Sequence, residues 1–225
     1  MQRFLSFLKH HKQLLLLLYA LIYWPWFSWL EQHVTGHYHI LHVPFDDMIP
    51  FCEFFVIPYY LWFAYIAAGM LFIAFADAAT CYRMAVFLIT GMTAFLIIST
   101  CYPNGLDLRP ETFPRENVFT GLVRTMYEAD TPTNVLPSLH VYNSIGIHLA
   151  LCATPRLNRA KWIRWISGIL AVLIILSTVF IKQHSILDVI AACALAAVMY
   201  PVSYLLLPRL MQKIRSKKQS RSEIG

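Results

Sequence analysis

Long apolar segments recur along the chain, separated by short polar connections. Each is about as long as the roughly 20 helical residues that cross a hydrocarbon core. There are six of them, at 13–30, 51–75, 84–100, 139–153, 163–181 and 186–207. The fourth is short and carries His140, Asn143 and His148, so we expect it inside the bundle, away from lipid. The pattern predicts an all-α polytopic membrane protein with a six-transmembrane-helix bundle.

The composition agrees with this prediction and argues against a water-soluble protein. Hydrophobic residues make up 58% of the chain and charged residues 13%, whereas soluble domains have about 45–50% and about 25%. A soluble bundle of buried helices is the minor alternative, because the six segments leave no amphipathic surface for water. The first segment follows a basic start, as in a secretory signal, but it continues through Trp26 without a small-residue cleavage site. We expect a retained first span.

The positive charges predict the orientation in the membrane. With a cytoplasmic N-terminus, 14 of the 18 lysines and arginines lie on the cytoplasmic side. The other four are Arg109, Arg115, Arg124 and Lys182. By the positive-inside rule both termini are then cytoplasmic, and the connection 101–136 faces outside.

This topology also explains the net charge of +6. Only Asp77 and Glu223 of the 12 acidic residues lie inside, which gives +12 inside and −6 outside. The basic balance therefore indicates topology, and we expect no nucleic-acid partner. We divide the chain into a basic cytoplasmic N-terminus (1–12), a membrane domain (13–208) and a basic cytoplasmic tail (209–225).

Three polar clusters fall on the predicted outer side. They are Leu108-Arg109-Pro110, Pro137-Ser138-Leu139-His140 and Lys182-Gln183-His184-Ser185-Ile186-Leu187-Asp188. In the second, Pro137 and Ser138 are helix-start residues, so His140 lies in a first helical turn. The free N–H groups and positive dipole end of such a turn favour an anion such as phosphate.

The third cluster places His184 and Asp188 four residues apart, on one face of a helix. Asp188 then accepts a hydrogen bond from one ring nitrogen and leaves the other free to attack or to move a proton. A lone pair of this spacing is more often a structural cap. Two histidines, an arginine and a carboxylate together are the parts of metal-free phosphoryl transfer: nucleophile, acid, charge clamp and orienter. The conjunction of the three clusters is the specific signal.

These clusters resemble the three motifs of the type 2 phosphatidic acid phosphatase (PAP2) superfamily, K-x6-R-P, P-S-x-H and S-R-x5-H-x3-D. The resemblance implies that His184 attacks phosphorus and that Asp188 orients it. It also implies that His140 protonates the leaving oxygen, that Arg109 and Ser138 hold the phosphate, and that no cofactor or metal is needed.

Two positions depart from these motifs. Tyr102 stands where the family has lysine, and Thr178 where it has arginine. Lys182 is the expected substitute, with Arg115 or Arg124 as alternatives. Fewer fixed cations suit a singly charged phosphodiester better than a dianionic monoester.

Three functions therefore stay open. We expect first the hydrolysis of a membrane lipid phosphate or pyrophosphate, phosphatidic acid-like or polyprenyl. Transfer of a lipid head group, as in inositol phosphorylceramide and sphingomyelin synthases, follows closely, and a catalytically inactive lipid-binding or transport protein is third. The expected partners are a lipid phosphate substrate and the bilayer, in a bacterial cytoplasmic membrane with the site facing outside. The sequence predicts no oligomeric state and does not name the lipid.

Three other features carry weaker expectations. Apolar residues recur at helical spacing between Pro114 and Tyr127, which predicts an amphipathic interfacial helix over the pocket, with simple loop packing as the alternative. An acidic group at 46, 47 and 53 favours helix-start stabilisation before substrate binding. Four histidines (His33, His37, His39 and His42) lie in one connection without a partnering cysteine, so a zinc site is the minor reading.

Overall fold

The computed structural model describes residue 16 and residues 18–222. The predicted N-terminal segment 1–12, the start of the predicted first span and Glu223 lie outside the described residues. In chain order the elements are α2 (Ala20–His33), β1 (His39–Ile40), α3 (Pro44–Met48), η2 (Glu53–Phe55), α4 (Val56–Ala76), α5 (Ala78–Cys101), β2 (Asn104–Gly105), α6 (Val118–Ala129), α7 (Leu139–Ala153), η3 (Pro155–Leu157), α8 (Lys161–Phe180), α9 (Ile186–Tyr200), η4 (Pro201–Leu206) and α10 (Leu207–Ser222).

Four helices of the described part are long and apolar enough to cross a membrane. They are Glu53–Ala76, Ala78–Cys101, Lys161–Phe180 and Ile186–Lys213. They correspond to the predicted second, third, fifth and sixth spans. The predicted fourth span is the shorter apolar helix α7, and α2 is the described part of the first. The fold is therefore a helical membrane bundle, while the count of six and the orientation of the termini remain predictions.

Two helix limits differ from those predicted. Helix α5 begins at Ala78, six residues before the apolar run, because the Asp77 carboxylate caps it by accepting the Thr80 N–H at 3.0 Å. The last helix does not end at Leu207 but continues as α10 to Ser222. It passes Pro201 through a π-helical turn, a geometry that accommodates the missing N–H of proline.

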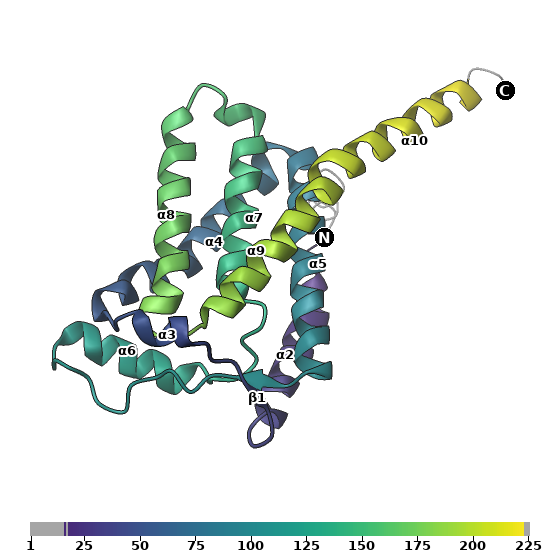
Figure 1. Ribbon diagram of the computed structural model, residues 1–225. Helices are drawn as coiled ribbons and strands as arrows, with labels where there is room; N and C mark the ends of the chain where they lie inside the picture. The colour runs from purple at the N-terminus through teal and green to yellow at the C-terminus, as the bar shows by residue number, and fades with distance from the viewer. Residues whose placement is uncertain (1–15, 17, 223–225) are drawn as a thin grey trace, which may run out of the picture.

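Helix α7 is the centre of the bundle. It contacts α4, α5, α8 and α9, and Tyr142, Ile147 and Ala150 are fully buried. The Tyr142 ring lies over Gly91 of α5, where an added Cβ would collide with it, and its O–H donates to the Phe87 carbonyl at 2.8 Å. The prediction that this polar span lies inside the bundle is confirmed. In Figure 1 it lies among these helices.

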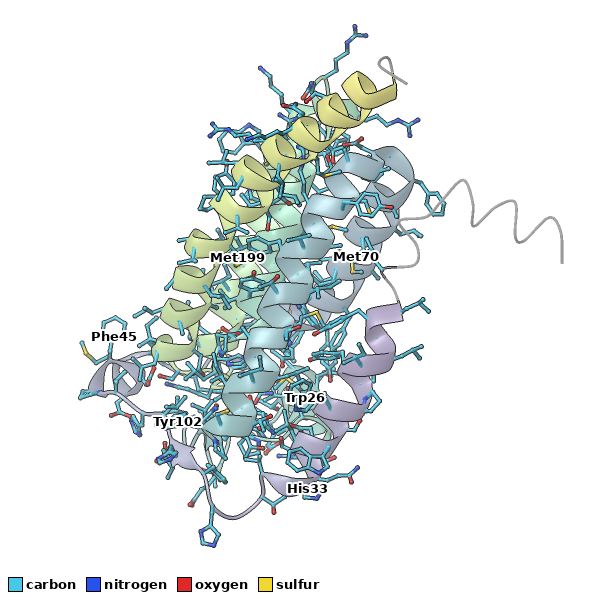
Figure 2. The ribbon with its side chains drawn as sticks, turned by 90° about the vertical axis from the view of Figure 1, so that its right-hand side faces the viewer. Trp26, His33, Phe45, Met70, Tyr102 and Met199 are labelled. Carbon is cyan, nitrogen blue, oxygen red and sulfur yellow. The ribbon has the colours of Figure 1, made fainter. Side chains whose placement is uncertain are left out.

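The short elements gather at one end of the bundle, here called the loop end: β1, α3, β2 and α6. The two strands pair in parallel, with His39 opposite Asn104. Figure 1 shows α3 and α6 at this end and α10 leaving the opposite end as a single helix. In Figure 2 Met70 and Met199 lie at mid-height of the bundle, and Phe45 of α3 projects at the loop end. Contacts of Lys182 with α3 and of Arg109 with the end of α6 place the third and the first polar clusters at the loop end.

Candidate active site

Two helix starts meet at the loop end. Helix α7 begins after Ser138, whose Oγ accepts the Val141 N–H at 3.4 Å, and α9 begins after Ser185, whose Oγ accepts the Leu187 N–H at 3.2 Å. The Ser138 N–H donates to the Asp188 carbonyl at 3.3 Å. Ser138 is fully buried, and its O–H has no acceptor among the described residues. The second and third clusters are therefore neighbours.

His184 is held by the carboxylate one turn along α9. Its Nδ1 lies 3.2 Å from Oδ2 of Asp188, which also accepts the Ser185 N–H at 2.9 Å. An ionised carboxylate only accepts hydrogen bonds, so this contact favours the tautomer with the proton on Nδ1 and the lone pair on Nε2. No other described residue hydrogen-bonds to Nε2. This geometry is compatible with the predicted roles of His184 as a nucleophile and Asp188 as its orienting partner.

His140 faces His184 from the first turn of α7. The centroids of the two imidazole rings are 5.7 Å apart. Two aromatic rings of α4 hold His140, with centroids 4.5 Å away for Tyr59 and 4.3 Å for Trp62. The Nε2 atom of His140 is buried and has no hydrogen-bond partner in the described part of the chain. Because such an atom is costly to leave unpaired, it points to a ligand or water beside the two histidines.

Arg109 contacts Gln183, the residue that precedes His184 in the chain. Its Nε donates to Gln183 Oε1 at 3.0 Å, and its two Nη atoms donate to the carbonyls of Tyr127 at 3.0 Å and Asp130 at 2.6 Å. The guanidinium also stacks on the Tyr127 ring, 4.5 Å from its centroid. Burial lowers the pKa of Arg109, and the charge of Asp130 opposes that shift. Two of the five N–H groups of an arginine remain for a ligand.

Lys182 contacts the loop-end helix α3. Its Nζ donates to the backbone carbonyls of Asp46 and Ile49, each at 2.6 Å. The Asp46 carboxylate in turn accepts the Ser185 O–H at 2.6 Å and the Ile186 N–H at 2.8 Å. Burial lowers the pKa of Lys182, and the charge of Asp46 opposes the shift. The structure thus uses Lys182 and Asp46 to fasten α3 to the start of α9, and the predicted phosphate contact of Lys182 stays a prediction.

The other two candidate cations have carboxylate partners. Arg115 pairs with Glu53 at 3.2 Å, and Arg124 pairs with Glu116 at 3.0 Å. Tyr102, at the position where the first PAP2 motif has lysine, stacks on the His39 ring with centroids 4.3 Å apart. At the second such position, Thr178 is buried and its hydroxyl donates to the Ile175 carbonyl at 2.8 Å. Of these cations, Arg109 is the one that hydrogen-bonds to Gln183, the residue before His184.

Five residues around the site were not predicted as site residues: Tyr59, Trp62, Asp130, Gln183 and Asp46. Tyr59 and Trp62 are three apart, and this spacing could have placed them on one face of the predicted second span. Gln183 lies inside the third cluster, between the predicted site residues Lys182 and His184. Asp130 gave no local signal, since its contacts are to residues 53 and 71 positions away.

Two of the predicted features, the amphipathic segment and the acidic residue Glu53, lie beside the site. The amphipathic segment forms α6, with Val123 and Met126 buried and Val118 exposed. This confirms the helix. Glu53 begins η2, as expected for helix-start stabilisation, and also accepts a hydrogen bond from Asn117 at 3.0 Å, which ties it to the start of α6.

The four histidines of the first connection do not converge. His33 bonds to the Trp29 carbonyl, His39 stacks on Tyr102, and His42 contacts Asp47 and Asp107. Among the described residues, no three His, Cys, Asp or Glu side chains group as metal ligands.

Comparison with known proteins yields one family. The sequence model of the PAP2 superfamily matches residues 84–212, which is 129 of the 225 residues. The match includes all three polar clusters and helices α7, α8 and α9. Neither the curated proteins nor the solved structures gave a match.

Proposed function

The chain belongs to the PAP2 superfamily, and on that premise we propose that it is a metal-independent lipid phosphate phosphatase that works through a phosphohistidine. The superfamily comprises phosphatases and related phosphotransferases, and the apolar helices make this member an integral membrane protein. The proposed substrate is a phosphomonoester or pyrophosphate of a membrane lipid, phosphatidic acid-like or polyprenyl. We propose that the site faces outside, in a bacterial cytoplasmic membrane.

The observation that carries the proposal is the His184–Asp188 pair opposite His140. The proton on Nδ1 of His184 points to Asp188 at 3.2 Å, which leaves the Nε2 lone pair for phosphorus. When the new N–P bond forms, the bond from phosphorus to the lipid oxygen breaks, and His140 gives that oxygen a proton. Water then attacks the phosphohistidine and loses a proton to His140. The N–P bond breaks, inorganic phosphate leaves, and both histidines return to their starting state.

The phosphate oxygens need donors throughout both steps. Two unpaired N–H groups of Arg109 and the unpaired O–H of Ser138 are the proposed donors. Backbone N–H groups in the first turn of α7 add to them, because a helix start favours a negative charge. Such donors stabilise charge that develops in the transition state.

A second candidate, head-group transfer, is favoured by the shortage of free cations. Arg115 and Arg124 are paired with carboxylates, and Lys182 donates to the carbonyls of Asp46 and Ile49. Arg109 donates to Gln183, the residue before His184, and keeps two N–H groups, so it is left as the proposed clamp. A single guanidinium matches the single charge of a phosphodiester better than the two charges of a monoester. In this reaction a lipid alcohol replaces water in the second step and a new phosphodiester forms. An inactive lipid-binding protein is the third candidate.

One assay separates the three candidates. Purified protein is incubated with phosphatidic acid, polyprenyl pyrophosphate or phosphatidylinositol, with and without a lipid alcohol. Release of inorganic phosphate supports the phosphatase, and a new phosphodiester supports the transferase. Neither product, from folded protein, supports the inactive protein and overturns the proposal.

A trapping experiment tests the intermediate. Brief reaction with a substrate labelled at the phosphate should leave label on the wild type that acid removes and base does not, as for a phosphoramidate. His184→Ala should carry no label and show no turnover. Label or turnover in a folded His184→Ala variant would refute the assignment of the nucleophile.

A further inference from the structure

A polar network joins the C-terminal end of α6 to both halves of the site. Its centre is Asp130, the residue that ends α6. Oδ2 of Asp130 accepts the Tyr59 O–H at 3.0 Å and the Gln183 side-chain N–H at 3.0 Å. The Asp130 carbonyl accepts from Arg109 at 2.6 Å. Asp130 and Tyr59 lie outside the three polar clusters, and they connect Arg109 of the first cluster with Gln183 of the third.

The first branch of the network decides which way the Gln183 amide points. An amide has an acceptor at one end and donors at the other. Because its NH₂ end is bound to the Asp130 carboxylate, its oxygen faces the Nε–H of Arg109 at 3.0 Å. Without the carboxylate the amide could turn, and its NH₂ group would then face the Nε–H of Arg109, donor against donor. Asp130 thus fixes the guanidinium from two sides, through its own carbonyl and through Gln183.

The second branch reaches His140. Tyr59 is almost fully buried, and its only side-chain hydrogen-bond partners among the described residues are Asp130 and Gln183. Its ring packs against the His140 ring in a tilted arrangement, with centroids 4.5 Å apart and planes 31° apart. Fixing the Tyr59 O–H fixes the ring on which the imidazole rests. One carboxylate therefore restrains both the proposed phosphate clamp and the proposed acid.

We propose that Asp130 is a positioning residue that holds Arg109 and His140 in register for phosphoryl transfer. The inference rests on the proposed function, since it assumes that these two side chains act on one phosphate. It explains how a site with Tyr102 and Thr178 in place of two cations works with one guanidinium. A clamp already held by three hydrogen bonds and a stacked ring loses little freedom when a phosphate binds.

Substitution of Asp130 tests the proposal. Asp130→Leu removes the acceptor and keeps a branched side chain with the same number of heavy atoms, and we expect kcat/KM to fall on the order of 10²-fold, the loss typical of a misplaced catalytic group. Asp130→Asn keeps one oxygen for both donors and should recover most of that loss. Glu128→Gln, on an exposed side chain with no hydrogen bond in the described structure, is the matched control and should leave the rate unchanged.

A second substitution separates positioning from stability. Gln183→Met cuts the branch to Arg109 and should mainly raise KM, with kcat less affected, because the His140 branch is intact. The double variant Asp130→Leu/Gln183→Met should lose less than the product of the two single losses, because both act through one contact. The proposal would be overturned if Asp130→Leu and Asp130→Asn lost kcat/KM equally and their Tm values fell equally. Multiplicative losses in the double variant would also overturn it.

Binding of orthovanadate separates this inference from the reaction itself. Vanadate imitates the five-coordinate phosphorus between the two histidines and requires no turnover. We expect Asp130→Leu to raise its Kd about tenfold, measured by calorimetry on the detergent-solubilised protein. If the wild type turns over no lipid yet shows this shift, the proposed reaction fails and the positioning of the site stands. An unchanged Kd, or no vanadate binding by the wild type, overturns the positioning role.

Discussion

The contact between His184 and Asp188 gives a prediction whose size follows from the structure. In Asp188→Asn the atom at Oδ2 must still accept the Ser185 N–H at 2.9 Å, so the amide oxygen takes that place. His184 Nδ1 then still donates to an oxygen at the same position. The tautomer is kept, the Nε2 lone pair is kept, and only the negative charge is lost.

The loss of kcat depends on the positive charge that His184 gains when it attacks phosphorus. A carboxylate about 4 Å from that charge contributes about 4 kcal/mol at an effective dielectric constant of about 20. A hydrogen bond to a charged partner exceeds a neutral one by about 1–1.5 kcal/mol, which sets a lower limit. At about 1.36 kcal/mol per factor of ten, Asp188→Asn should lower kcat roughly 10- to 10³-fold.

The amide NH₂ takes the place of Oδ1, which is buried without a partner. This placement should lower the free energy of unfolding by about 1–3 kcal/mol. Rates of phosphate release at saturating substrate are therefore compared well below the Tm of the variant. Glu116→Gln, an exposed carboxylate change beside Arg124, is the control with unchanged rate. A folded Asp188→Asn variant within about threefold of the wild-type kcat would refute the orienting role.

Four further predictions follow from other contacts. His140→Ala should lose about 10²–10⁴ in rate, measured with lipid substrates, and less with a good leaving group; equal losses would contradict its role as the acid. Activity should survive EDTA, and a chelator-sensitive rate would require a metal site. The pKa of His42 is raised, chiefly by its hydrogen bond to Asp47; its stabilisation is then present below the unfolded pKa of about 6.5 and lost as pH rises through the folded value. His42→Gln should therefore lower Tm at about pH 6 and much less at about pH 9, and a pH-independent change would count against the ion pair. Lys182→Met should lower the free energy of unfolding by about 2–3 kcal/mol, because two carbonyls lose a charged donor; a raised KM at unchanged stability would instead favour the predicted phosphate contact.

Much of the site could be predicted because its parts are local. A four-residue spacing puts His184 and Asp188 on one helix face whatever surrounds the helix. Ser138 caps α7 through the N–H of Val141, three residues on, a contact that depends on the chain alone. The same holds for α6, whose apolar spacing determines which face is buried.

The partners of the charged residues could not be predicted in this way. Lys182 binds carbonyls at Asp46 and Ile49, more than 130 positions away, and Asp130 meets Gln183 53 positions away. Which cation faces a phosphate and which fastens a loop depends on the packing of α3 and α6 against the helix ends.

The sequence by itself determined the helical membrane class, the polar fourth span and the histidine–carboxylate pair, because hydrophobic length and helical period act within a few residues. Only the tertiary structure decided that Gln183 and the end of α6 hold Arg109, and that Lys182 binds carbonyls of α3. It also decided that Asp130 connects Arg109 to the Tyr59 ring, which supports His140. Those choices are made by hydrogen bonds between distant segments. Each depends on how buried donors and acceptors are paired once the helices have packed.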